Sequence, residues 1–368
     1  MDLGTLIARM RQGQTLKRIG RRPLAQFGTQ TRPLIGATIL PERPVRENAF
    51  RDEGVRYRTF VANAGTRYSP VQLKEGALVG SVLVELGESD IGSELTSREY
   101  DVLIELLGNN ASMDAEAQII NFLDITINQA LIQYNEMQRW MGLVRRMIER
   151  RGDNAYVEDI PVITPAGHMI YALLPWDHED VDPFDDIGAA CQVLRDKGFE
   201  PEEIWTRSQV PTLMSKNPNV KTRTGRITIV GGGGVPTIQG LGGRVTLDEI
   251  NAQLQADNNP PLQVYDGRYN TEDASIPYIE DGAVVIIGRT DRREEILLDN
   301  NEIELLEGTL GYLAVGRAAG QSDPGRVIQA EHKTNKPPRI EAEGWQTSGP
   351  VFQEPEAWVT IRRTHLGA

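Results

Sequence analysis

The chain has 368 residues, of which 39% are hydrophobic and 25% are charged, so it is long enough for one large domain or two ordinary domains. Its 52 acidic side chains outnumber the 39 basic ones, and the net charge of -13 argues against a protein that reads nucleic-acid sequence. The single cysteine, Cys191, excludes an intrachain disulfide and a cluster of thiolate metal ligands. No apolar stretch approaches the roughly 20 residues that span a bilayer. We therefore expect a globular protein made in a reducing cytoplasm.

The first fifty residues have the pattern of an arm. Residues 1–22 are amphipathic and basic, which fits either a frayed terminus or an arm that docks on a neighbouring subunit or an internal partner. Residues 30–48 contain three prolines and no helical period, which predicts an extended strap that crosses a surface.

A long hairpin is expected next. Apolar and polar residues alternate over 55–60 and again over 82–86, and glycines punctuate the sequence between them. This pattern predicts two strands joined by a long loop. Since such a hairpin has little apolar material of its own, we expect it to lie over another subunit.

Residues 112–150 are expected to form one long helix. Ser112 is the predicted N-cap, Asp114 lies in the first turn, and four arginines precede Gly152, so that charge matches the helix dipole at both ends. At ~1.5 Å per residue such a helix is about 55–60 Å long. Apolar residues recur at gaps of three or four, at Ile120, Leu123, Ile127, Leu131, Tyr134, Met137, Met141, Val144 and Ile148. No second helix of matching length is expected, so this one must pack on a sheet or on other subunits.

After the helix, residues 156–163 and 168–174 are both strand-like and are separated by a turn, which predicts a second hairpin. Asp182 and Pro183 then supply the N-cap and first position of a helix. Further along, Thr246 and Glu249 form a capping box that opens another helix. The chain thus becomes mixed α/β beyond the hairpin.

The same region contains shorter elements. We expect a short helix at 208–216 and strands at 204–206, 262–265 and 283–287, the last of these directly after a turn at Asp281 and Gly282. A glycine-rich loop is expected over 308–325, and a β pattern returns over 327–368.

Two motifs resemble a phosphate-binding loop and a calcium-binding loop, but each lacks a feature that such a site requires. Gly231–Gly234 follows an apolar strand but lacks the helix that a phosphate loop requires directly behind its glycines. The acidic stretch 177–186 carries enough oxygens for calcium, but its spacing does not match a calcium-binding loop. A solvated loop that caps the following helix explains this stretch as well.

No catalytic constellation appears elsewhere in the chain. The four histidines, His168, His178, His332 and His365, lack the spacing of a zinc-binding helix, and there is no Gly-x-Ser-x-Gly elbow around a nucleophilic serine. We therefore predict no catalytic, cofactor-binding or metal-binding residues, no cofactor, and a protein that is not an enzyme.

Four short motifs, taken in order, carry a resemblance to a known family. They are Asp182-Pro183 with Asp186-Ile187, then Val264-Tyr265-Asp266, then Pro277 to Gly282 with the apolar run after it, and Gly308 to Tyr312. In this order they resemble the lambda capsid protein E family of tailed bacteriophages, whose fold is the Hong Kong 97-type capsid fold.

The resemblance implies an α+β fold with four parts. An N-terminal arm is expected at 1–50 and an extended β-hairpin loop at 51–96. A peripheral domain would comprise 97–178 and 331–368, with a spine helix at about 112–150. An axial α/β domain would comprise 179–330.

The resemblance also implies a function. The protein would be the major capsid (head) protein of a tailed double-stranded DNA bacteriophage, assembled in the host cytoplasm as pentamers and hexamers that close an icosahedral shell around the packaged genome. The expected partners are further copies of the chain, a portal, a scaffold or protease, and a decoration protein. We expect neither sequence-specific DNA binding nor membrane contact. Lys74 is the only lysine of the extended loop, and no crosslink through it is expected.

Two alternatives stay open at this point. An encapsulin-like compartment would have the same fold and would hold cargo enzymes in place of DNA. A metal-dependent or hydrolytic enzyme built on residues 179–330, with the acidic stretch 177–186 as its site, would belong to another class altogether.

Overall fold

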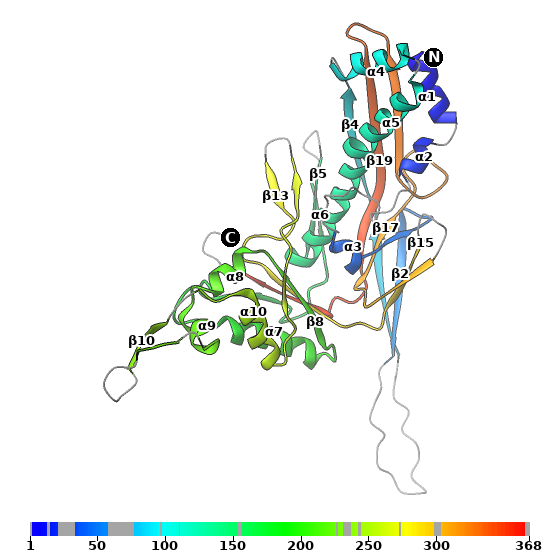
Figure 1. Ribbon diagram of the computed structural model, residues 1–368. Coiled ribbons are helices and arrows are strands. Elements are labelled where there is room, and N and C mark those ends of the chain that lie inside the picture. The colour runs from blue at the N-terminus through cyan, green and yellow to red at the C-terminus, as the bar shows by residue number, and fades with distance from the viewer. Residues whose placement is uncertain are drawn as a thin grey trace, which may run out of the picture.

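The computed structural model describes residues 2–12, 15–20, 34–57, 77–95, 98–109, 111–152, 157–225, 227–230, 237–241, 244–271, 274–297 and 303–364. Figure 1 shows an elongated part, in which a long helix lies along a sheet, and a compact α/β part beside one end of it. Among the described residues, no helix is both long and apolar enough to cross a membrane.

The long helix is present but ends earlier than its sequence pattern predicts. It runs through α5 (Ser112–Leu123), a π-helical segment (Asp124–Asn128) and α6 (Gln129–Arg145), which gives a length of about 50 Å. The predicted N-cap is wrong, since Ala111 holds that position and no side chain caps the helix. The predicted end at 150 is also wrong, because β5 (Met147–Arg151) follows at once.

Arg146 explains why the helix stops. Its backbone is left-handed (φ 56°), a conformation that few residues other than glycine adopt. Its buried guanidinium donates hydrogen bonds to the carbonyl oxygens of Trp358 (2.6 Å) and Pro355 (3.0 Å) and lies 3.5 Å from the centre of the Trp358 ring. These distant contacts hold Arg146 in place, and the burial lowers its pKa to about 9.

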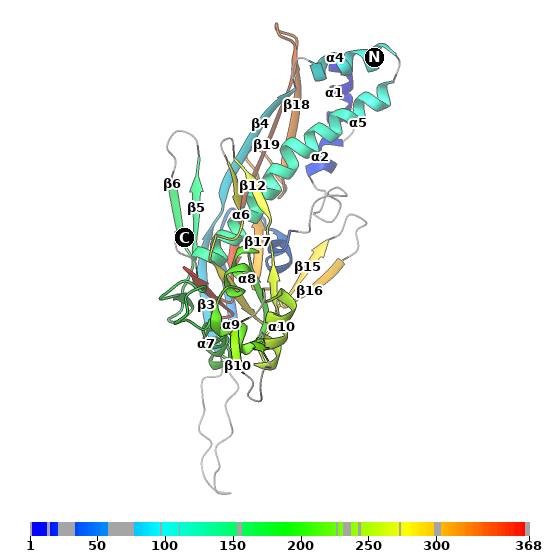
Figure 2. The ribbon, with the colours of Figure 1, turned by 60° about the vertical axis from the view of Figure 1, so that its left-hand side comes forward.

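The elongated sheet lies against this helix (Figure 2). Its central strand is β19 (Arg339–Phe352), which pairs with β4 (Gly87–Leu95), β18 (Val327–Lys333) and β17 (Gly311–Val315). β1 (Glu42–Pro44) adds a parallel strand outside β17. Helix and sheet approach closely at Gly344, where an added Cβ would clash with Ile127 of the π-helical segment and lie 3.4 Å from Leu131.

The N-terminal residues pack on their own chain. α1 (Leu3–Gln12) and α2 (Thr15–Gly20) bury Leu3, Leu6 and Met10 in one core with α4 (Arg98–Gly108), α5 and β18. The part of the predicted strap that is described contains a short helix, α3 (Gly36–Ile39). Ile39 and Leu40 are buried, so this segment belongs to the subunit core.

A hairpin is present in the predicted region, but residues 87–95, which were expected in the extended loop, form β4 of the elongated sheet. β2 (Ala49–Tyr57) pairs antiparallel with β3 (Ala77–Glu85), and residues 58–76 lie outside the described part of the chain. Further along, the described residues form other two-stranded hairpins, among them β9 (Ile227–Val230) with β10 (Thr237–Leu241), β12 (Arg268–Asn270) with β13 (Ser275–Pro277), and β15 (Arg293–Leu297) with β16 (Ile303–Glu307).

The compact part is a five-stranded sheet covered by helices. Its strand order is β11 (Leu262–Val264), β8 (Pro201–Thr206), β14 (Val284–Gly288), β20 (Trp358–Arg362) and β7 (Met169–Tyr171). Val284 and Ile286 of β14 face a core with α7 (Pro183–Asp196) and α10 (Leu247–Ala256). Val285 and Ile287 face α6. Alternate side chains of the central strand therefore hold the helices to one face and the long helix to the other.

Several local predictions in this part are confirmed. Asp182 caps α7 by accepting a hydrogen bond from the Phe184 amide (3.0 Å), and Thr246 and Glu249 form both bonds of the capping box. The short helix α8 (Gln209–Met214) is present and is followed by α9 (Pro218–Arg223), which the sequence pattern had not indicated.

Three predicted pairings or segments are wrong. β6 (Val157–Pro161) pairs with β5, and β7 pairs with β20, so residues 156–174 form no hairpin of their own. The expected loop at 308–325 contains β17. The terminal strand β20 lies in the compact sheet rather than returning to the elongated one. An alternating sequence pattern predicts that a segment is a strand. It does not predict which strand pairs with it, because the partner can lie far away in the sequence.

Glu136 joins the parts of the molecule. Its fully buried carboxylate accepts hydrogen bonds from the Gly36 amide (2.8 Å), the Trp140 indole (2.8 Å) and the Tyr265 hydroxyl (3.2 Å). Arg139 lies 3.4 Å away and donates to the Leu40 carbonyl. Burial and the Glu136 carboxylate raise the pKa of Tyr265, which keeps its hydroxyl protonated. One carboxylate thus connects strap, long helix and compact part.

We predict that Glu136→Gln destabilises the protein by about 3 kcal/mol, because it removes the nearer of the two carboxylates that face the buried Arg139 guanidinium, the other being Glu42 at 3.9 Å. Urea unfolding measures the loss. The control is Glu105→Gln on the exposed face of α4, which is expected to cost less than about 0.5 kcal/mol. Equal effects of the two substitutions would contradict the role given to Glu136.

A second prediction concerns the contact between helix and sheet. Gly344→Ala is expected to cost about 1–3 kcal/mol, since the added methyl group clashes with Ile127. Gly92→Ala is the matched control on the neighbouring strand, where the nearest atom is 3.9 Å away. Thermal melting compares the two variants, and a Gly344→Ala protein as stable as Gly92→Ala would show that the approach is looser than described.

Candidate assembly surface

The acidic stretch 177–186 is held in place by the chain itself. Asn217 donates hydrogen bonds to the carbonyl oxygens of Trp176 (3.0 Å), His178 (2.8 Å) and Val181 (2.9 Å). Arg223 lies 3.2 Å from Asp182 and 2.9 Å from Asp185. This arrangement fits the interpretation of a loop that caps α7.

Asp186 accepts a hydrogen bond from the Trp176 indole (2.8 Å). Burial raises the pKa of Asp186, since its carboxylate is partly withdrawn from water. Over the described ranges, no three histidine, cysteine, aspartate or glutamate side chains are grouped so that they could hold a metal ion.

The other candidate groups are scattered. His168 is buried and faces the Glu356 carbonyl (3.0 Å), while His332 lies 2.9 Å from the Tyr100 hydroxyl. His365 lies outside the described residues. Cys191 is buried in the α7 core, and burial raises the pKa of its thiol to about 11. The described residues bring none of these groups together.

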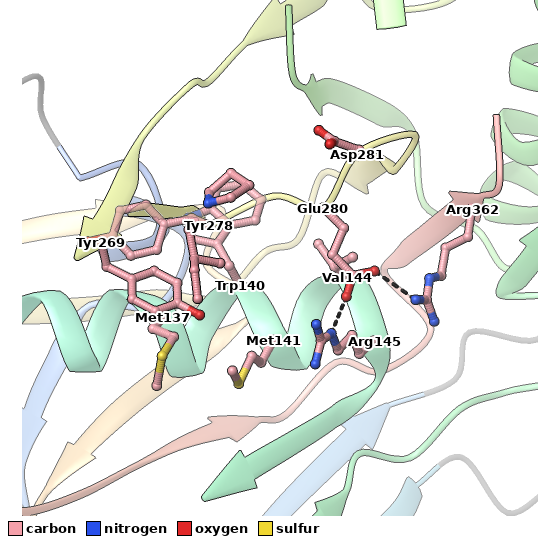
Figure 3. A pocket seen from close by; sticks show the side chains of 12 residues that line it. Met137, Trp140, Met141, Val144, Arg145, Tyr269, Tyr278, Glu280, Asp281 and Arg362 are labelled. Carbon is pink, nitrogen blue, oxygen red and sulfur yellow. Dashed lines mark hydrogen bonds and ion pairs between the residues drawn. The ribbon is translucent and has the colours of Figure 1, made fainter. Parts of the chain in front are cut away.

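An apolar groove with a volume of about 280 Å³ lies between α6 and the β12–β13 hairpin (Figure 3). Met137, Met141 and Val144 line it from the helix, and Ile276 and Tyr278 from the hairpin. Methionine side chains adapt their shape easily, as suits a surface that packs against a partner.

Stacked aromatic rings connect the groove to the core. Tyr278 lies 6.0 Å from Tyr265 with nearly parallel rings (4°), and Tyr265 lies 5.4 Å from Trp140. Tyr269 completes the row at 5.5 Å from Tyr278. Because Tyr265 also contacts Glu136, the wall of the groove is fixed by the buried junction beneath it.

The polar end of the groove is a three-part ion pair. Glu280 lies between Arg145 of α6 and Arg362 of β20 and contacts both (Figure 3). The Arg362 guanidinium is 2.7 Å from its carboxylate. Beyond this bridge a smaller depression of about 140 Å³ is lined by Tyr171, Asp281 and Arg363 in addition to Glu280 and Arg362.

Tyr171, which lines this depression, belongs to a stretch of sequence with several exposed apolar side chains. Leu173 is 98% exposed, and Val157, Ile163, Tyr171 and Leu174 are between 40% and 60% exposed. Exposed apolar side chains favour contact with a partner that removes them from water. We name these five residues, with the groove, the candidate assembly surface.

The sequence prediction named none of these residues as functional. Adjacent leucines at 173 and 174 lie between the end of β7 at Tyr171 and Pro175. Both leucines are exposed, and no periodicity of the sequence distinguishes them from leucines that enter a core.

The whole fold is similar to that of a solved prophage protein. Neither a family model nor a curated protein matches the sequence. Among solved structures, the putative capsid protein of a prophage of E. coli CFT073 aligns with a TM-score of 0.55 and 12% identity over 95% of this chain and 98% of that one. The chain therefore has the Hong Kong 97-type capsid fold, as the sequence resemblance implies.

Two other solved structures align over most of the chain with lower scores. A phage-related protein of Bordetella bronchiseptica RB50 gives a TM-score of 0.48 and 14% identity over 96% of this chain and 98% of that one. The SrpI encapsulin of Synechococcus elongatus PCC 7942 gives 0.42 and 10% identity over 93% of this chain and 90% of that one.

Cys191 provides a test of the site description. Because the thiol is buried and its pKa is raised to about 11, the native protein is expected to react with a thiol-specific chromogenic disulfide at least about a hundredfold more slowly than the urea-unfolded protein at pH 8. Absorbance measures both rates. Fast reaction in the native state would mean that the thiol is accessible and available for chemistry.

Proposed function

We propose that the protein is the major capsid (head) protein of a tailed double-stranded DNA bacteriophage. The observation that carries the proposal is the capsid fold, which extends over 95% of the chain without a separate catalytic domain added to it. The candidate assembly surface supports it, since an isolated subunit leaves Leu173 and the apolar groove in water.

In this proposal the subunits form pentamers and hexamers that close an icosahedral shell in the host cytoplasm. Ring contacts of this kind are heterologous, so that one patch of a subunit meets a different patch of the next. The β2–β3 hairpin suits such a contact, because an isolated two-stranded hairpin is marginally stable in water. A portal, a scaffold or protease, and a decoration protein are the proposed further partners.

The net charge of -13 fits a shell that encloses DNA without reading its sequence. An acidic lining repels the phosphate backbone and leaves the genome free to enter and leave. The division into an arm at 1–50, an extended loop at 51–96, peripheral segments and an axial domain remains part of this proposal, with β4, β17 and β18 assigned to the peripheral sheet and β7 and β20 to the axial sheet.

The direct test is the assembly state of the full-length protein. We expect analytical ultracentrifugation of the expressed chain to show closed particles of many subunits, and negative-stain electron microscopy to show shells. A compact monomer under all conditions of salt and crowding would contradict the proposal. Particles that hold a cargo protein and no DNA after phage growth would contradict the phage assignment.

Leu173→Ser tests the surface itself. Since the side chain is 98% exposed in the subunit, the substitution is expected to leave the melting temperature of the subunit unchanged. It is expected to lower the yield of shells about tenfold, because a leucine that becomes buried on assembly contributes about 1.5–3 kcal/mol.

The control variant is expected to lose stability of the isolated subunit, which Leu173→Ser is expected to keep. Leu194→Ser removes a fully buried leucine of α7 and is expected to destabilise the subunit by more than about 2 kcal/mol. Normal shell yield for Leu173→Ser would show that this residue lies outside the contacts between subunits.

A further inference from the structure

One segment carries charge of the opposite sign to the rest of the chain. Residues 204–247 contain six lysines and arginines and no aspartate or glutamate, although acidic residues outnumber basic ones by 52 to 39 overall. The segment builds β8, α8 and α9, which belong to the compact part. A local excess of positive charge in an acidic protein indicates a site for an anion.

Three of these cations line one cavity. It has a volume of about 320 Å³ and is lined by Thr212, Ser215, Lys216, Lys221 and Arg244. α8 and the turn after it contribute Thr212, Ser215 and Lys216, while Lys221 comes from α9 and Arg244 from just before α10. Segments separated along the chain thus bring three positive charges to one place.

Two other cations of the segment are paired within the protein, and Arg226 lies outside the described residues. Arg207 contacts Asp266 and Asp281, and Arg223 contacts Asp182. By contrast, the structure records no ion pair for Lys216, Lys221 or Arg244 with any residue in its described ranges.

The donors that remain in the cavity are charged ones. Thr212 donates its hydroxyl proton to the Ser208 carbonyl (2.8 Å) and accepts a hydrogen bond from Arg244 (3.3 Å). Ser215 donates to the Thr212 carbonyl (2.7 Å). Both hydroxyl protons are therefore used, and the remaining donors among the residues that line the cavity belong to Lys216, Lys221 and Arg244.

We propose that this cavity binds phosphate groups. A single carboxylate carries one negative charge and cannot balance three cations. A terminal phosphate carries about two negative charges, and a polyphosphate or a nucleic-acid backbone carries one negative charge on every phosphate. Charge-assisted N–H···O bonds from lysine and arginine are the usual contacts of such oxygens. The acidic remainder of the chain does not prevent this, since exposed charges beyond about 8 Å are largely screened at physiological salt.

The inference does not depend on the shell function, because it concerns an anion bound by a single subunit. Inorganic tripolyphosphate and a short duplex DNA share the relevant chemistry and serve as the two probes. Calorimetric titration of the full-length protein with each is expected to show binding that weakens as salt rises.

The test variant is Lys216→Gln/Lys221→Gln/Arg244→Gln. The control, Arg98→Gln/Arg289→Gln/Lys336→Gln, removes the same charge at exposed positions elsewhere. We expect the cavity variant to bind tripolyphosphate about tenfold more weakly or worse, and the control to stay within about twofold of the wild type. A parallel loss for duplex DNA would identify a nucleic-acid backbone as an occupant, and a loss for tripolyphosphate alone would identify a free polyphosphate.

Equal weakening by the two variants would overturn the proposal in favour of bulk charge. A cavity variant that binds both probes normally but changes its sedimentation would also overturn it, and would indicate that acidic side chains of a second copy occupy the site. As an independent measurement on the wild type, tripolyphosphate is expected to slow acylation of Lys216 and Lys221 but not of Lys336, as followed by mass spectrometry. Unchanged acylation of all three would contradict the assignment.

Discussion

The buried carboxylate of Glu136 is the constraint on which the arrangement of the molecule depends. A charge in the interior is tolerated only when partners surround it. Glu136 obtains them from three regions, since Gly36 belongs to the strap, Trp140 to the long helix and Tyr265 to the compact part. A displacement of any one of these regions would leave a charge or a donor unsatisfied, so the three are fixed relative to one another.

Other polar contacts extend this constraint along the helix. Asn135 exchanges hydrogen bonds with Gln346 and accepts one from Ser348, so the helix is held in register on β19. At the helix end Arg146 binds the backbone next to Trp358. Buried polar networks of this kind select one packing among several that apolar contacts alone would allow. The groove on the surface takes its shape from the same network through Tyr265 and Tyr278.

The sequence was informative where structure is decided locally. Asp182 and Thr246 satisfy amides within three residues of themselves, so their caps were predictable, as was the apolar strand β14. The helix end at Arg145 was not, because it depends on contacts of Arg146 with residues more than 200 positions away. In the sequence, Glu136 resembles any polar residue of a helix. The exposure of Leu173 depends on how the chain packs after β7, which the residues around it in the sequence do not indicate.

The central claim is that the surface formed by the groove and by residues 157–174 is covered by a neighbouring copy of the chain. An electron cryo-microscopy reconstruction of assembled particles at side-chain resolution tests this most directly. The account predicts density of a second subunit against Leu173 and in the groove between Met141 and Ile276. Particles in which both face solvent would contradict it.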